Sequence, residues 1–200
     1  MPIDASYALA NGCRFAVCRL VKQSETNWAL RLASIQALDG RTNEWWSKLH
    51  QSLQITPAEM PSEIIPSLLL VHIIYHSCLC ALHSSIVPLF SWSTSDRASP
   101  YARQLSAQSA LQHANAISSL LGTAREVQLD PARMPSFIGY AAYCACAVQI
   151  PFLWYSKPEI KGRAHANFLR NLGVMQGIGK HWKFIELLVS LSYLTVAVRS

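Results

Sequence analysis

Residues 64–87, IIPSLLLVHIIYHSCLCALHSSIV, decide the fold class of this 200-residue chain. The stretch belongs to a longer segment, between Glu63 and Asp96, that contains no Asp, Glu, Lys or Arg. Two further segments without these residues follow at positions 134–156 and 187–198. Helices of this composition are either covered on all sides by protein or cross a bilayer. The sequence therefore predicts long apolar helices at the centre of the molecule.

The overall composition favours a folded domain with extensive burial. Hydrophobic residues make up 51% of the chain and charged residues only 14%, whereas about a quarter is usual. A chain of this length can form one domain and bury roughly 70% of the surface that it exposes when unfolded. Helical periodicity recurs along the chain, and no segment shows the sustained alternation of a strand. We therefore expect an all-α protein, a compact multi-helix domain with largely buried central helices.

Apolar spacing, proline and glycine place the expected helices. Asp4 can cap the first, Gly40 and Gly122 are expected to end the second and the fifth, and Ser136 is expected to cap the sixth. In the fifth helix, Tyr101, Leu105, Leu111, Ala114, Ile117 and Leu121 are expected on the buried face, as are Phe168, Leu169 and Leu172 in the seventh. The expected ranges are 4–20, with Leu9, Cys13, Val17 and Leu20 on one face, then 26–40, 45–53, 66–87, 100–122, 137–150, 163–175 and 180–198.

The charge is uneven along the chain. The net charge is +6, and the segment from Lys157 to Arg199 carries seven basic and two acidic side chains. A basic region can meet nucleic acid or an anionic membrane surface, but a solvated helix face is the more usual reason for such charges. The basic residues are spread out and show no recognition-helix pattern, so we do not expect direct DNA reading.

The six cysteines occur as three close pairs. Met1 to Asn11 lacks the basic start and apolar run of a secretory signal, so we expect a reducing compartment and structural thiols. On a helix, Cys-x-Cys directs its two sulfurs about 200° apart, so Cys78 with Cys80, or Cys144 with Cys146, does not clamp one metal.

Three histidines and four aromatic residues are the candidates for a site. His72 and His76 have the i, i+4 spacing of a helical metal pair, with His83 further along, but Ile73 stands where a zinc protease has its Glu. No third ligand or nucleophile motif accompanies them, so we expect no catalytic, cofactor-binding or metal residues and no enzyme. The aromatic residues Phe152, Trp154, Tyr155 and Trp182 could line a cavity for an apolar effector, although such residues more often belong to a core.

A membrane protein is the first alternative. Residues 64–82 and 137–155 are each long enough to span about 30 Å of hydrocarbon as a helix. The three histidines in or next to the first stretch, and Gln149 and Pro151 in the second, count against this interpretation because polar groups inside a bilayer are costly. We therefore favour buried core helices over membrane-spanning ones and keep the membrane protein as an alternative.

An ordered set of short motifs resembles a known family. Leu38-Asp39 and Trp45-Trp46-x-x-Leu49 precede an apolar helix that runs from Leu68 into Leu79-x-x-Leu82-His83. After it come Ser109-Ala110-x-x-His113-Ala114-x-x-Ile117, Phe137-x-x-Tyr140-Ala141-Ala142-Tyr143, and a closing stretch from Leu172 to Trp182. Taken in order, these elements resemble the regulatory domain, or middle homology region, of fungal zinc-cluster transcription factors. Ser84-Ser85 departs from the Arg-Pro that usually follows Leu-His in that family.

The resemblance covers residues 38–198 and leaves residues 1–37 as an N-terminal helical segment of the same domain. It implies an all-α, non-catalytic regulatory domain that controls transcription of target genes in the nucleus. The family binds DNA through a separate six-cysteine cluster with two zinc ions, whose spacing this chain lacks. Zinc and direct DNA contact are therefore not expected in this chain, which would be part of a longer protein or a form without its DNA-binding module.

The expected partners are proteins of the transcription machinery or a parent DNA-binding domain, together with a small apolar effector or a second copy of the chain. Two alternatives stay open. One is the multi-span helical membrane protein, and the other is a truncated module that binds a partner or a small ligand.

Overall fold

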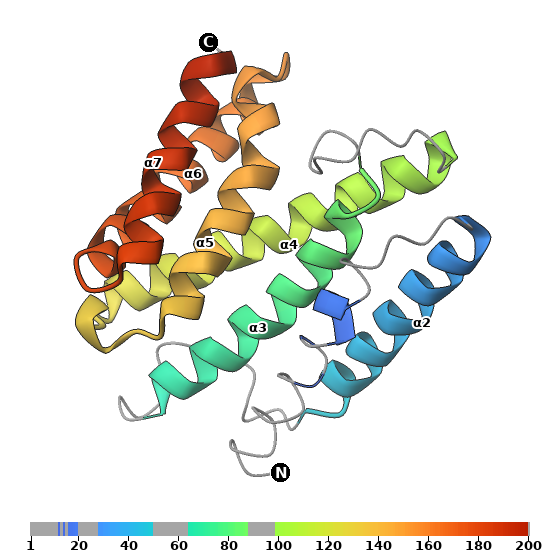
Figure 1. Cartoon of the computed structure of the whole chain (residues 1–200), viewed down its shortest axis with the longest axis horizontal. Coiled ribbons are helices and arrows are strands. Elements are labelled where there is room, and N and C mark those ends of the chain that lie inside the picture. The colour runs from blue at the N-terminus through green and yellow to red at the C-terminus, as the bar shows by residue number, and fades with distance from the viewer. Residues whose placement is uncertain are drawn as a thin grey trace. The chain divides into compact units, whose positions relative to one another are not determined.

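The described part of the chain is helical throughout. A computed structural model describes residues 28–49, 64–87 and 99–199, together with residues 12, 14 and 16–19. The regular elements, shown in Figure 1, are α2 (Trp28–Ser47), α3 (Ile65–Ser84), α4 (Pro100–Glu126), η2 (Pro131–Arg133), α5 (Ser136–Gln149), η3 (Ile150–Trp154), α6 (Pro158–Gly179) and α7 (Lys183–Arg199). Here η denotes a short 3₁₀ helix. The described residues contain no strand, and the prediction of an all-α protein is confirmed.

The chain divides into two compact units, residues 1–110 and 111–200, and the long helix α4 contributes to both. In the first unit, α2 packs on α3. In the second unit, α6 contacts both α5 and α7, while η2 and η3 also pack against α6. Each unit carries one of the two clusters of interacting side chains described below.

Helix α3 is the buried central helix that the uncharged stretch predicts. Twelve of its 20 residues are buried, and Pro66 lies in its first turn, where a missing N–H costs no hydrogen bond. The helix ends three residues before the predicted end at Val87, with Ser85 at its C-cap. Its hydroxyl donates to the carbonyl of Leu82 over 2.7 Å.

Two glycines expected to end helices lie inside them. Gly40 is within α2, which continues to Ser47 and includes the two tryptophans assigned to a separate segment. Gly122 is within α4, and a Cβ atom there would lie 3.2 Å from Nε of Arg170 on α6. Gly122 thus allows α4 and α6 to pack closely, and it does not end α4. Residues 50–53 of the predicted segment 45–53 are outside the described residues.

The prediction of which residues form the buried face of α4 is partly wrong. Ala114, Ile117 and Leu121 are buried, but Tyr101 and Leu105 are exposed and Leu111 is half-buried. The buried stripe instead contains small and polar residues that hydropathy does not emphasise: Ser106, Ala110, Ser118 and Ala124.

Other helix boundaries also differ from the predictions. Ser136 begins α5 without capping it, since the cap position belongs to Pro135, and Asp130 instead caps η2 by accepting from the amide of Ala132. Helix α6 begins at Pro158, a favoured first residue, and continues past its predicted end at Met175 to Gly179. Leu169 on α6 is exposed, contrary to its predicted inward position.

The first predicted helix lies mostly outside the described residues, as do Leu9, Cys13 and Leu20 of its expected face. Residues 14 and 16–19 are helical, and Val17 is buried. Helix α7 begins at Lys183, three residues after the predicted start of the last helix.

Small residues set the distance between α5 and α7. A Cβ atom on Gly139 would lie 2.9 Å from a methyl carbon of Ile185, which is fully buried. Ala141, Ala142 and Ala145 are also fully buried on α5. These short side chains allow α5 and α7 to pack closely against each other.

Candidate functional site: two polar clusters

An aromatic and histidine cluster joins α2 to α3 in the first unit. Trp46 stacks on Tyr75 with ring centroids 4.0 Å apart and an interplanar angle of 12°. The ring of His72 meets Trp46 edge-on at 4.6 Å, and His76 lies 4.9 Å from the ring of Tyr75. Such aromatic arrangements add to the stability gained from burial alone.

The two histidines therefore pack against rings in this cluster. Among the described residues, no group of three or more His, Cys, Asp and Glu side chains is arranged to hold a metal ion. The i, i+4 spacing of His72 and His76 places both of their rings beside the ring of Trp46.

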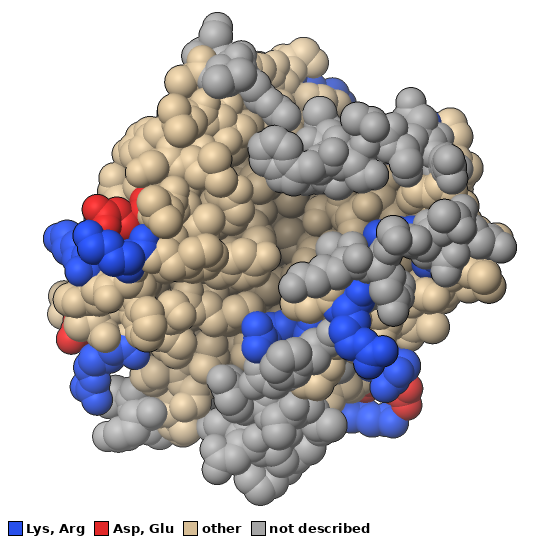
Figure 2. All heavy atoms as spheres, viewed as in Figure 1, with Lys and Arg blue, Asp and Glu red and all other residues tan. Residues whose placement is uncertain are grey.

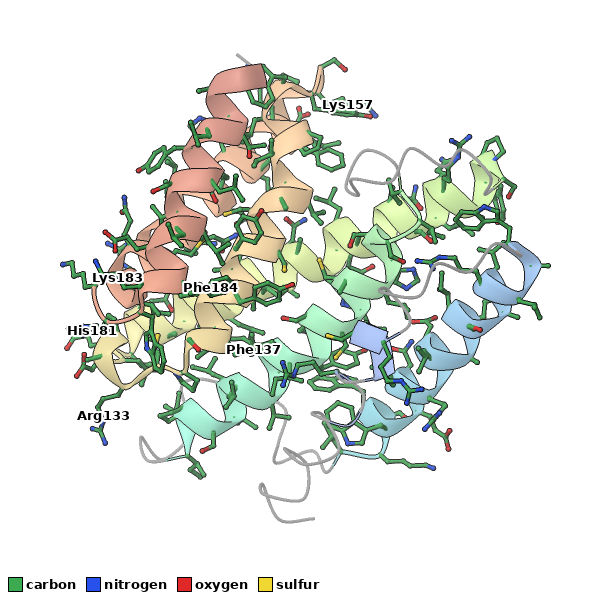
Figure 3. All side chains as sticks on the ribbon, in the orientation of Figure 1. Arg133, Phe137, Lys157, His181, Lys183 and Phe184 are labelled. Atoms are coloured by element: carbon green, nitrogen blue, oxygen red, sulfur yellow. The ribbon has the colours of Figure 1, made fainter. Side chains whose placement is uncertain are left out.

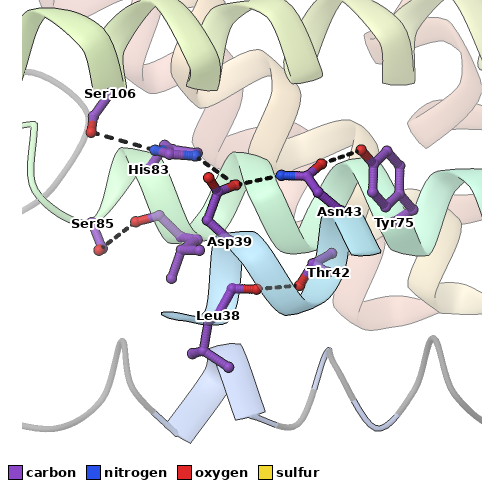
Figure 4. Close-up of polar contacts among 9 residues, drawn as sticks. Leu38, Asp39, Thr42, Asn43, Tyr75, His83, Ser85 and Ser106 are labelled. Atoms are coloured by element: carbon purple, nitrogen blue, oxygen red, sulfur yellow. Dashed lines mark hydrogen bonds and ion pairs between the residues drawn. The ribbon is translucent and has the colours of Figure 1, made fainter. Parts of the chain in front are cut away.

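A line of polar contacts runs beside this cluster and is drawn in Figure 4. The hydroxyl of Tyr75 donates to the amide oxygen of Asn43 over 2.8 Å, and the Asn43 amide nitrogen donates to Asp39 over 2.9 Å. Nε2 of His83 lies 3.5 Å from the Asp39 carboxylate, while its Nδ1 lies 3.4 Å from Oγ of Ser106. We call these five residues the α2–α3 relay. It joins α2, α3 and the start of α4.

The relay places serine, histidine and aspartate in the order of a hydrolase triad, but its burial does not suit catalysis. Ser106 is only 6% exposed, and both contacts of His83 are long for hydrogen bonds. A nucleophile must reach a bound substrate as well as its base. The relay instead fits a structural connection between helices.

Burial has the largest influence on the pKa of the Tyr75 hydroxyl. Loss of contact with water, followed by repulsion from the Asp39 carboxylate, raises the pKa of the Tyr75 hydroxyl to about 12. A phenol is protonated at neutral pH, and the raised pKa keeps Tyr75 a hydrogen-bond donor to Asn43 further into the alkaline range.

A different cluster, made of uncharged side chains, fills the centre of the second unit. The hydroxyl of Ser118 donates to the carbonyl of Ala114 over 2.9 Å. It accepts from Nε2 of Gln149 over 2.9 Å and from Nδ2 of Asn171 over 3.0 Å. A hydroxyl can donate once and accept twice, so all its capacity is used. Asn171 also donates to Oε1 of Gln149 over 3.0 Å.

These side chains come from α4, α5 and α6, and the cluster extends to the surface. Asn167 donates to Oδ1 of Asn115 over 2.9 Å and accepts from Arg170 over 3.0 Å. Ser118, Gln149 and Asn171 are fully buried. We call this set, Asn115, Ser118, Gln149, Asn167 and Asn171, the amide network. It fixes the register of three helices because a shift of one helix would leave its polar groups buried and unpaired.

Cys146 lies in the same buried region, and its thiol is 3.9 Å from the carbonyl oxygen of Phe168. Burial raises the pKa of the Cys146 thiol to about 12. The thiol is therefore neutral and unreactive at neutral pH. Cys78 and Cys80 are likewise buried, and Cys144 is half-buried, in keeping with a structural role.

The four aromatic residues predicted to line an effector cavity are absent from the lining of two hollows of the second unit. Two hollows lie on the surface of the second unit, one of about 550 Å³ beside Gly122 and Arg170, and one of about 360 Å³ beside Lys180 and Glu186. Phe152 is half-buried in η3, whereas Trp154, Tyr155 and Trp182 are exposed. None of the four lines either hollow.

Hydropathy did not reveal the amide network, although two signals were present. Asn167 and Asn171 are spaced i, i+4 on the face of α6 that also carries Phe168 and Leu172. Gln149 lies at the end of an otherwise apolar helix. Amides at buried positions predict mutual hydrogen bonding, but their partners on other helices become visible only in the fold.

Comparisons with protein families, with curated proteins and with solved structures found no match to this chain.

Proposed function

We propose that this chain is a non-catalytic regulatory domain of the kind found in fungal zinc-cluster transcription factors. It acts in the nucleus on transcription of target genes, through contacts with other proteins. DNA is bound by a zinc cluster outside this sequence. Any effect on DNA is therefore indirect.

The observation that carries the proposal is the role of the motif residues in the first unit. Three motif residues contact the apolar helix α3. Two of them, Asp39 and Trp46, lie on α2, and Leu49 follows just after it. Asp39 contacts His83, Trp46 stacks on Tyr75, and Leu49 belongs to one core cluster with Leu68. The ordered motifs thus coincide with the contacts that join α2 to α3, which supports the family resemblance on physical grounds.

A reporter assay tests the proposal. The chain is fused to an unrelated DNA-binding domain in a fungal cell, and expression of a reporter with matching sites is measured. We expect the fusion to raise or lower expression relative to the DNA-binding domain alone. Trp46→Ala removes the stacked ring at the centre of the α2–α3 contact, and the effect should be lost.

The matched control is Trp154→Ala, which removes an exposed ring and should leave the effect unchanged. Protein levels of all fusions are compared by immunoblot. A stable fusion that enters the nucleus and leaves expression unaltered would contradict the proposal.

The membrane alternative rests on a separate observation. Two described helices are long and apolar enough to cross a bilayer: Ile65–Ser84 and the combined segment Ser136–Trp154. In the first, 67% of the most apolar window is buried within the protein, and in the second 56%. Core helices share these properties, which favours the regulatory domain. Carbonate extraction separates the two, since a membrane-spanning chain stays in the pellet.

A further inference from the structure

Helix α7 carries an apolar stripe that the second unit leaves uncovered. Ile185, Leu188 and Ser192 face inward. Tyr193 is exposed on another side of the helix, where its hydroxyl accepts from Gln176 over 3.0 Å. The exposed Phe and Leu side chains repeat at steps of three, four and three residues. These are Phe184 (56% exposed), Leu187 (68%), Leu191 (37%) and Leu194 (61%). We call them the α7 seam. At 100° per residue, the seam covers roughly 80° of the helix circumference and about 15 Å of its length.

The spacing indicates what kind of surface fits the seam. Alternating steps of three and four residues are those of the a and d positions in a coiled coil. The stripe is narrow, whereas a helix that lies in a membrane interface has a broad apolar face opposite a strongly charged one. The seam therefore fits another helix.

The charges around the seam indicate which charge the side chains of a bound helix would carry. Lys183 precedes the seam by one residue, and Lys180 and His181 lie in the turn before it. Figure 3 shows Arg133, His181 and Lys183 at the same end of the second unit, in agreement with the packing of Pro131 against Gly177. In Figure 2, blue basic groups gather at this edge, beside a red acidic group. Glu186 is the acidic residue nearby and pairs with Lys183 over 3.2 Å. The positive end of the α7 dipole adds to this field.

From this geometry we propose that the α7 seam binds an amphipathic helix that carries acidic side chains beside its apolar residues. A second copy of α7 fits less well. In a parallel pair, Lys183 would meet its counterpart, and in an antiparallel pair it would meet the stretch 187–198, which has no acidic residue. The inference goes beyond the proposed function, because it holds for any role of the chain. The short seam corresponds to a small, weak and reversible interface.

A pair of designed peptides tests the inference on the full chain. One is a two-heptad helical peptide with Leu at the a and d positions and Glu at the flanking e and g positions. Its twin has Lys in place of Glu. We expect the Glu peptide to bind, measured by fluorescence anisotropy, and its affinity to fall as salt concentration rises. The Lys peptide should bind at least about tenfold more weakly.

Variants of the chain locate the binding site. Leu187→Asp should weaken binding of the Glu peptide by about tenfold or more, because a charge would replace an apolar contact. Lys183→Glu should weaken binding of the Glu peptide and strengthen binding of the Lys peptide. The matched control is Leu105→Asp on α4, also an exposed leucine, which should have no effect. Circular dichroism verifies that each variant folds.

Several results would overturn the inference. Equal binding of the two peptides, no binding of either, or an equal loss with Leu105→Asp would each do so. Self-association of the chain that Leu187→Asp abolishes would assign the seam to a second copy instead. Binding to phosphatidylserine vesicles that Leu187→Asp abolishes would assign it to a membrane. The reporter assay of the fusion does not depend on these outcomes.

Discussion

Both units join apolar helices through polar side chains, but the polar groups are titratable in the first unit and neutral in the second. In the first unit, the α2–α3 relay contains three titratable groups, Asp39, Tyr75 and His83, and Asp39 is partly open to water. In the second, the amide network consists of one hydroxyl and four amides, of which three side chains are fully buried. Enclosing neutral groups costs less than enclosing charged ones, which need access to water or an opposite charge, and one enclosed amide oxygen, Oδ1 of Asn171, has no hydrogen-bond partner among the described residues.

This difference predicts unequal responses to substitution and pH. The amide network should tolerate no change in its donors and acceptors, yet be insensitive to pH. The relay should be more tolerant of substitution, because water can replace lost partners at the exposed Asn43 and at Asp39, but it should respond to pH. Four experiments test the contrast.

Asn171→Asp should have the largest effect. It removes both donors that hold Gln149 and Ser118 and places a carboxyl group in a buried site, at a cost of roughly 3–5 kcal/mol in the free energy of unfolding. Burial should raise the pKa of the new carboxyl group, so the cost should grow as pH rises above about 4. Urea unfolding at several pH values measures it. Gln176→Glu, exposed on the same helix, should cost far less.

Ile117→Ala tests the packing beside the amide network. Ile117 is fully buried, so its truncation should cost about 2–4 kcal/mol of unfolding free energy. Leu111→Ala, on the same helix but half-buried, should cost clearly less. Both are measured by urea unfolding. A near-neutral result for Ile117→Ala would show that this part of α4 is not core.

Tyr75→Phe tests the relay and should cost only about 1 kcal/mol, the usual loss for one hydrogen bond. The raised pKa means that the contribution of Tyr75 to stability is complete below pH 10 and is lost as pH rises toward 12. The unfolding free energy of the variant should therefore fall less steeply over that range than that of the wild-type chain. Tyr101→Phe, at an exposed tyrosine, serves as the control.

The last experiment measures the accessibility of thiols rather than stability, and it compares one cysteine of each unit. Cys18 is an exposed thiol in the first unit, and Cys146 is buried in the second. We expect a maleimide to label Cys18 in the native chain at neutral pH and to reach Cys146 only after denaturation. Peptide mass spectrometry identifies the labelled cysteines. Rapid native labelling of Cys146 would contradict the burial of the network region.

Much of the fold follows from local patterns in the sequence. The uncharged run around Leu79 predicted a buried helix, and Pro66 indicated where it begins. The start of α6 at Pro158 was missed, since that helix was expected from residue 163. The glycines misled the prediction, because Gly40 and Gly122 resemble helix ends. Termination depends on the free energy of a whole helix in its surroundings, and tertiary packing readily outweighs the cost of about 1 kcal/mol for a glycine.

By itself, the sequence determined the helical class, the buried character of α3 and the excess of basic residues after Lys157, since composition and periodicity act locally along the chain. Tertiary structure alone decided that His83 meets Asp39, that Gln149 meets Asn171, and that Leu187 remains exposed on α7. These outcomes depend on which helix faces which. That choice is governed by side-chain packing and hydrogen bonds between residues far apart in sequence, to which no local pattern refers.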